Sequence, residues 1–335
     1  MRRWWMAVAL AATLSAFSLC NIRDVIDTVR AGLRSQESDG SIAKSLRKLQ
    51  LAERLTDEVI EALEVEGAGP KTVAELAALR DESEDLKPPA EPLPFEHPAQ
   101  PGSAEITQLL REARQNAASY AKLLPDFICE EVVDRSQQAG GIWRRVDSLE
   151  IRLTFFQRRE DYKLISVNGR PRTASMDDIG GAFSKGEFGS ILNLLVAYPA
   201  TFRWDHWTTL RRRPAHVFAF RVDREYEPYH IQFQSGRIGR PSSAAVGQVG
   251  WVYVDSETKN VLRLVADAID IPVSFPVQKS KVRVDYDFVQ VGASSYLLPI
   301  RAEVRMAAGP VVTRNVVSFR AYRKFGAETS ITFGQ

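Results

Sequence analysis

The stretch Lys281-Val-Arg-Val-Asp-Tyr-Asp-Phe288 alternates charged and apolar side chains without a break. Successive side chains of a β-strand point to opposite faces, so this alternation predicts a strand with one apolar and one charged face. We expect the apolar face to meet the protein core and the charged face to meet water. Such a strand is typical of an antiparallel sheet that is covered on one side.

Further strand-like segments flank this stretch, and they predict a large antiparallel sheet. They are residues 127–133, 149–156, 161–167, 202–204, 215–222, 229–233, 251–254, 261–264, 296–306, 311–322 and 331–333. A helix is expected before them, from the N-cap residue Ser103 to Leu124, because apolar residues recur at helical spacing up to Pro125. Residues 177–197 interrupt the strand pattern and predict a short inserted helix that acts as a lid or plug. Residues 103–335 are therefore expected to form the β-rich domain of an α+β protein.

Residues 19–86 form an acidic segment with apolar residues at helical spacing and no strand-like alternation. The pattern predicts helices, and Ser41 is expected to cap a second helix that continues to Leu63. Residues 87–102 are rich in proline, which fixes φ and removes a backbone donor. They are expected to form an extended linker between the helical segment and the β-rich domain.

The segment Gly67-Ala-Gly-Pro-Lys-Thr-Val-Ala74 resembles the turn of a helix-hairpin-helix motif. In that family two glycines permit a tight turn, and amides at the start of the second helix hold a DNA phosphate. Acidic residues on both sides of this turn would repel a phosphate backbone. We therefore expect a structural helical hairpin that could contact a protein partner, and we do not expect nucleic-acid binding.

Residues 1–18 are expected to be a secretory signal peptide. Arg2 and Arg3 precede an apolar run that ends at Phe17 and is too short to cross a bilayer of ~30 Å. Small residues at 16 and 18 suit cleavage after Ser18. The mature chain is then exported, to the periplasm or outside the cell, without a transmembrane span, and association with the outer membrane stays open.

The hairpin formed by residues 251–254 and 261–264, joined by Asp255-Ser-Glu-Thr258, resembles the periplasmic lipoprotein carriers of the LolA, LolB and RseB type. That resemblance implies a curved antiparallel sheet that wraps around helices and binds acyl chains in a cleft, without catalysis. The chain also resembles a group of secreted bacterial proteins of unknown function. The segments 124–129, 186–190 and 322–325 carry that second resemblance.

The composition offers little material for catalysis or metal binding. The chain has 335 residues, a net charge of +2, four histidines and two cysteines. His206, His216 and His230 lack the spacing of metal ligands, and no Gly-x-Ser-x-Gly motif supports a hydrolase. We therefore predict no enzyme activity, no metal and no cofactor. The carboxylate pair Asp285 and Asp287 is interpreted as part of a solvated, salt-bridged face.

Seven apolar residues are candidates for a ligand-binding cleft or its lid: Phe155, Phe183, Phe188, Leu194, Leu195, Trp204 and Trp207. The function that they favour is an envelope protein that binds a lipid, an acyl chain or a lipoprotein. The alternative is an interaction scaffold that recognises a protein partner through the helical hairpin.

The two cysteines leave three readings open: a disulfide, an acylated Cys20 and a buried free thiol at Cys129. Export would place Cys20 and Cys129 in an oxidising compartment, where they could form a disulfide. Cys20 also lies where a bacterial lipoprotein would be acylated, although Leu19 is not the small residue usually found before that cysteine. In the third reading, Cys129 is a buried thiol that behaves as a small hydrophobic residue.

Overall fold

The computed structural model describes residues 19–84, 86–91, 93–95, 99–140, 142–172, 188, 191–226, 229–233 and 242–325. The chain divides into two compact units. One comprises Met1–His97 with Thr208–Arg212, and the other comprises Pro98–Trp207 with Arg213–Gln335. The predicted signal peptide, Phe183 and the predicted strand at 331–333 lie outside the described residues.

The first unit is a small helical domain. Its helices are α1 (Ile22–Arg34), α2 (Asp39–Leu46), α3 (Asp57–Val65) and α4 (Pro70–Glu82), and β1 (Leu19–Cys20) pairs in parallel with β2 (Gln50–Leu51). The expected second helix is wrong in two respects. Ser38, not Ser41, is its N-cap and accepts from the Ser41 amide. The helix also stops before β2, so the residues up to Leu63 form a separate helix.

The apolar stripes of these four helices meet in one closed core, which explains why the segment is helical. That core consists of Ile22, Val25, Ile26, Val29, Ile42, Leu46, Leu51, Leu55, Val59, Ile60, Leu63, Ala68, Leu76 and Leu79. Among the described residues, none of the helices combines the length and the hydropathy that a bilayer span requires.

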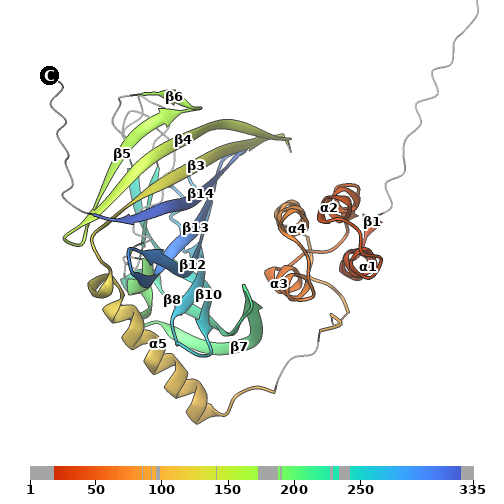
Figure 1. Ribbon diagram of the computed structural model, residues 1–335, viewed down its shortest axis with the longest axis horizontal. Coiled ribbons are helices and arrows are strands. Elements are labelled where there is room, and N and C mark those ends of the chain that lie inside the picture. Colours follow the sequence, from red (N-terminus) through yellow and green to blue (C-terminus); the bar gives the residue numbers. More distant parts are fainter. Residues whose placement is uncertain are drawn as a thin grey trace, which may run out of the picture. The chain divides into compact units, whose positions relative to one another are not determined.

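The second unit is built on one large antiparallel sheet (Figure 1). Helix α5 (Ser103–Leu123) precedes it, as the sequence predicts, but its N-cap is Gly102, so Ser103 is the first helical residue and not the cap. The strands are β3 (Phe127–Ala139), β4 (Ile142–Phe156), β5 (Arg159–Val167), β6 (Arg170–Pro171), β7 (Thr201–Leu210), β8 (Arg213–Val222), β9 (Tyr229–Phe233), β10 (Ser242–Asp255), β11 (Val261–Ile269), β12 (Lys279–Val291), β13 (Ser294–Ala308) and β14 (Val311–Lys324). Among the described residues their order is β6-β5-β4-β3-β14-β13-β12-β11-β10-β8-β7, with β9 paired to β10. The α+β fold class is therefore confirmed, and Figure 1 shows the strands bending into a curved sheet with α5 alongside it.

One face of the sheet is apolar and covered. Along β3, Phe127, Cys129 and Val133 are buried, whereas the alternate residues Glu130 and Asp134 are exposed. Helix α5 covers the apolar face, because the ring of Tyr120 meets that of Tyr286 on β12 edge to face, with 5.9 Å between centroids. The 3-10 helix η2 (Ile191–Leu195) contacts α5 in turn.

The opposite face differs from the expectation that charged residues there meet water. Asp285 and Arg263 are only 3% and 5% exposed. Arg263 Nε donates to Asp285 Oδ1 at 2.5 Å, and Arg283 Nε donates to Asp285 Oδ2 at 2.9 Å. Because β11 and β12 align these residues side by side, the long arginine side chains cover the carboxylate and exclude water from it.

Candidate ligand-binding site

A cluster of five aromatic rings occupies one end of the apolar face. Phe127 lies at its centre, with centroids 5.1 Å from Phe155, 5.2 Å from Phe188 and 5.4 Å from Tyr322. Phe188 also meets Phe319 at 5.5 Å. These separations are typical of favourable aromatic pairs. The apolar face therefore carries a dense aromatic surface at this end, with the buried Glu131 as the cross-strand partner of Phe319.

The strands set these rings in place. Phe127 on β3 and Phe155 on β4 are direct cross-strand partners, so their rings stack on the same face of the sheet. Tyr322 joins them from β14, where a bulge lies between Arg320 and Arg323. Its hydroxyl donates to the Pro299 carbonyl at 2.6 Å, which satisfies the polar atom of a largely buried ring. Burial raises the pKa of Tyr322, and the neighbouring Cys129 adds to this shift.

Phe188 is the ring of this cluster that belongs to no strand, and η2 follows it in the chain. Phe188 is 2% exposed, and Leu192, Leu194 and Leu195 of η2 are 1%, 4% and 0% exposed. The segment is tied to α5 by Arg114, whose Nε donates to the Leu195 carbonyl at 2.6 Å. Phe188 thus packs on the aromatic cluster of the sheet, and η2 carries three buried leucines beside α5. We call Phe188 with Leu192, Leu194 and Leu195 the plug.

Trp204 and Trp207 form a second cluster on β7. Their rings meet edge to face at 6.5 Å, and the Trp207 ring lies 3.9 Å from that of His216 on β8. Trp207 Nε1 also donates to the Ala99 carbonyl at 3.1 Å. Burial lowers the pKa of His216, which favours the neutral imidazole. The structure thus brings Phe155 and Phe188 together, buries Leu194 and Leu195 in η2, and pairs the two tryptophans separately.

The cysteines are not joined within the described residues. Cys129 is a buried free thiol on β3. Burial raises its pKa, and Glu131 adds to the shift. Cys129 thus packs as a small hydrophobic residue, and its pairing with Cys20 stays a prediction. The described residues also contain no group of three or more His, Cys, Asp or Glu side chains arranged to hold a metal ion.

The turn that resembles a helix-hairpin-helix carries an anion from the chain itself. The Asp39 carboxylate accepts hydrogen bonds from the amides of Lys71 and Thr72 at 2.8 and 2.9 Å, and from the Thr72 hydroxyl at 2.7 Å. A Cβ on Gly69 would lie 2.5 Å from Asp39 Cγ, so only glycine leaves room for this contact. The amides that hold a phosphate in that motif are occupied here by a carboxylate. The role predicted for the hairpin in binding a protein partner stays a prediction.

Replacing Asp39 with alanine is expected to lower the free energy of unfolding by about 0.5–2 kcal/mol at neutral pH, the usual cost of losing such a helix cap. Desolvation acts to raise the pKa of Asp39, but the hydrogen bonds from Thr72 and the two amides hold it below its ordinary value. The contribution is therefore complete above the unfolded-state pKa of about 3.9 and is lost as the pH falls through the lower folded-state value.

Urea denaturation of D39A and the unmodified chain from pH 7 down to pH 2.5 measures this contribution. The difference between the two proteins should shrink below about pH 4. Glu64, which is exposed on α3, provides the matched control, and E64A should show no such pH-dependent difference. A difference for D39A that stays constant down to pH 2.5 would contradict the assignment.

No protein-family model matches the sequence, and no curated protein matches it. Several solved structures are similar in fold. A LolA superfamily protein from Nitrosomonas europaea is 10% identical, with a TM-score of 0.31, covering 67% of this chain and 97% of that one. A DUF1329 family protein from Desulfovibrio piger is 12% identical, with a TM-score of 0.32 and coverages of 68% and 95%. The Mycobacterium tuberculosis lipoprotein LppX is 8% identical, with a TM-score of 0.25 and coverages of 64% and 95%.

Proposed function

We propose that this protein binds the hydrocarbon chain of a lipid or lipoprotein against the apolar face of its sheet, in the position that the plug occupies. It acts as a non-catalytic carrier in the cell envelope, to which the signal-like residues 1–18 direct it. The observation that carries the proposal is that Phe188, which belongs to no strand of the sheet, packs on Phe127 and Phe319 in the aromatic cluster, and that buried leucines of η2 follow it in the chain.

The free energy needed to expose the plug side chains is comparable to the free energy gained when a long hydrocarbon chain is buried in their place. Burying one large apolar side chain is worth about 1.5–3 kcal/mol, so exposing the four plug side chains costs about 6–12 kcal/mol. A buried methylene contributes about 0.8 kcal/mol, so a chain of about 8–15 methylenes offsets that cost. Long acyl chains should therefore displace the plug, and short ones should not.

Shortening the plug tests this exchange. Replacing Leu194 and Leu195 with alanine reduces the apolar surface that must leave, so the double variant L194A/L195A should bind a fluorescent long-chain fatty acid at least tenfold more tightly. Val196 follows them directly but is 37% exposed. The matched control V196A should bind like the unmodified chain. Fluorescence titration gives the three affinities, and far-UV circular dichroism checks that each variant is folded.

Unchanged affinity in a folded L194A/L195A would contradict the proposal, as would an equal gain in V196A. If the double variant does not fold, Phe188→Leu provides a milder reduction of the plug and should shift the affinity in the same direction. Native mass spectrometry of the unmodified protein, purified without harsh detergent, should in addition show a co-purified acyl compound.

A further inference from the structure

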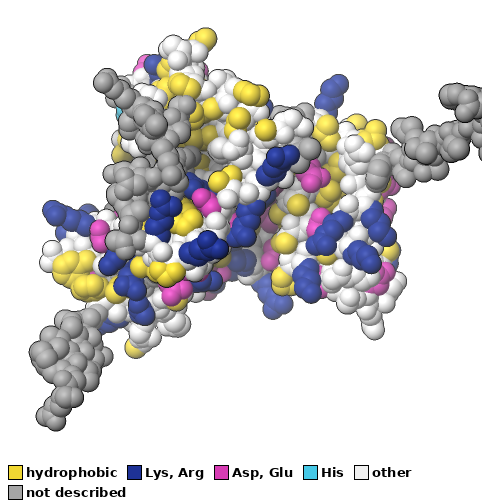
Figure 2. Space-filling view, turned by 90° about the horizontal axis from the view of Figure 1, so that it is seen from above, with side chains coloured by type: hydrophobic (Ala, Val, Ile, Leu, Met, Phe, Trp, Pro, Cys, Tyr) yellow, Lys and Arg dark blue, Asp and Glu magenta, His cyan; other side chains and the backbone are white. Residues whose placement is uncertain are grey.

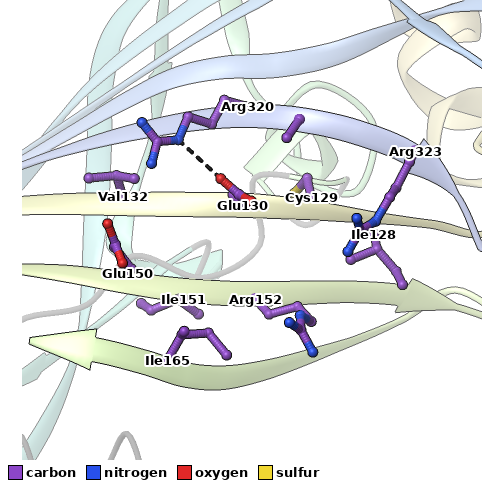
Figure 3. Close-up of a pocket in the computed structure, with 11 residues that line it drawn as sticks. Ile128, Cys129, Glu130, Val132, Glu150, Ile151, Arg152, Ile165, Arg320 and Arg323 are labelled. Atoms are coloured by element: carbon purple, nitrogen blue, oxygen red, sulfur yellow. Dashed lines mark ion pairs between the residues drawn. The ribbon is translucent and has the colours of Figure 1, made fainter. Parts of the chain in front are cut away.

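The sheet carries a depression on the face opposite the aromatic cluster. It has a volume of about 300 Å³ and lies over β5, β4, β3 and β14 (Figure 3). Its apolar floor consists of Ile128, Val132 and Ile165, which are half-buried. A cavity of this size is at the lower end of the range for small-molecule sites.

A β-bulge places two arginines at the rim of this depression. Arg320 pairs with Glu130 and Arg323 pairs with Ile128, so two residues of β14 stand opposite one residue of β3. Ala321 takes up the extra length with φ at 53°. The bulge directs Arg320 and Arg323 to the same face, while the Tyr322 ring packs into the aromatic cluster behind it. Ala321 thus lies in a bulge whose Tyr322 side chain is anchored in the core. The same bulge places two arginines on the opposite face of the sheet.

The charges around the depression do not balance. Glu130 forms an ion pair with Arg320 at 3.3 Å, and Glu150 accepts from the Ser166 hydroxyl at 2.8 Å. Within the part of the chain that the structure describes, no carboxylate forms an ion pair with Arg152 or Arg323. Figure 3 shows both side chains at the Ile128 end of the depression. Two exposed guanidinium groups therefore stand beside an apolar floor, and neither has an acidic partner among the described residues.

The surplus is small, because Glu130 and Glu150 line the depression together with three arginines. On the face that Figure 2 shows, Lys and Arg side chains are interspersed with hydrophobic and acidic ones and do not form one continuous field. Such a surface gives no reason to expect a long polyanion. The combination at the depression instead suits a small ligand that carries one anionic group.

We propose that this depression binds an anionic amphiphile. Its carboxylate or phosphate group lies between Arg152 and Arg323, and its hydrocarbon stem covers Ile128, Val132 and Ile165. The planar guanidinium group matches the oxygens of both anions and can bind them with two hydrogen bonds. This site is separate from the proposed acyl site, because the sheet itself lies between them.

The test is isothermal titration calorimetry of the full chain with dodecanoate, dodecanol, acetate and inorganic phosphate. Dodecanoate should bind saturably and more tightly than each of the other three. The double variant R152Q/R323Q should weaken dodecanoate binding by at least tenfold, because it removes the charge-assisted hydrogen bonds. Arg144 and Lys324 are exposed on the same two strands outside the depression, so R144Q/K324Q removes the same charge as a matched control. That control should bind like the unmodified chain.

Four outcomes would overturn the proposal. They are equal affinities for dodecanoate and dodecanol, equal losses in both double variants, phosphate binding that matches dodecanoate binding, and the lack of saturable binding. The plug variant L194A/L195A separates this site from the proposed function. It should leave the arginine-dependent component unchanged, whereas failure of the carrier proposal would appear as unchanged binding of the long-chain probe in that variant.

Discussion

Replacing Asp285 with alanine is expected to lower the free energy of unfolding by about 3–5 kcal/mol, because it leaves buried guanidinium charge without its carboxylate. The side chains of Asp285 and Arg263 are 4% and 7% exposed, and Arg283 approaches the other carboxylate oxygen. Taking charges out of water is costly, so the buried arginine and the buried aspartate are stable there only when they are paired. Urea denaturation followed by circular dichroism measures the loss.

Two further variants show whether burial of the charges causes the loss of stability in D285A. Glu130 and Arg320 form an ion pair on the same face, but their side chains are 56% and 57% exposed. E130A should therefore cost only about 0–1 kcal/mol. Removing both buried charges, in R263M/D285L, should recover most of the loss of D285A, since apolar replacements of a buried ion pair are often neutral. A cost below about 1 kcal/mol for D285A would show that water reaches this network.

This network also marks the limit of what alternation in a sequence can predict. The stretch from Lys281 to Phe288 does form a strand with an apolar and a charged face, because alternation is a local property of the chain. The burial of the charged face depends on Arg263, which comes from the neighbouring strand β11. Pairing with β11 decides whether Asp285 meets water, and one strand alone does not contain that information.

The same distinction applies to the order of strands. The helix at residues 103–124 and the hairpin at 251–264 were predictable because each is formed by neighbouring residues. The pairing of β3 with β14 joins segments near the two ends of the unit. Alternation in either strand says nothing about this partner, so the centre of the sheet could not be derived from the sequence.

Some residues of the candidate sites were predictable from the sequence, and others depend on how the strands pair. Phe155 and Phe188 were named for their apolar character, and the structure brings them together. Trp204 and Trp207 were named on the same ground, but they lie in a separate cluster on β7. The depression was missed altogether. Its arginines share a face only because of the bulge at Ala321, and a spacing of three residues in a strand normally indicates opposite faces.

Replacing Phe155 with alanine is expected to cost about 3–5 kcal/mol, the usual range for a buried phenylalanine. Phe155 is 2% exposed and stacks on Phe127 at 5.1 Å, in the centre of the aromatic cluster. Its loss would leave a cavity between β3, β4 and the plug, which the closely spaced strands cannot fill by moving together. Urea denaturation measures the cost, and binding of the long-chain fatty acid probe shows whether the cavity also eases displacement of the plug.

The next residue supplies a control of the same type. Phe156 is 41% exposed, since adjacent residues of β4 point to opposite faces, and its ring meets that of Phe325. F156A should therefore cost much less than F155A and should leave probe binding unchanged. Equal costs would mean that the register of β4 is shifted, because a shift by one residue exchanges the two faces. The pair thus tests the placement of the apolar face on which the carrier proposal depends, independently of any ligand.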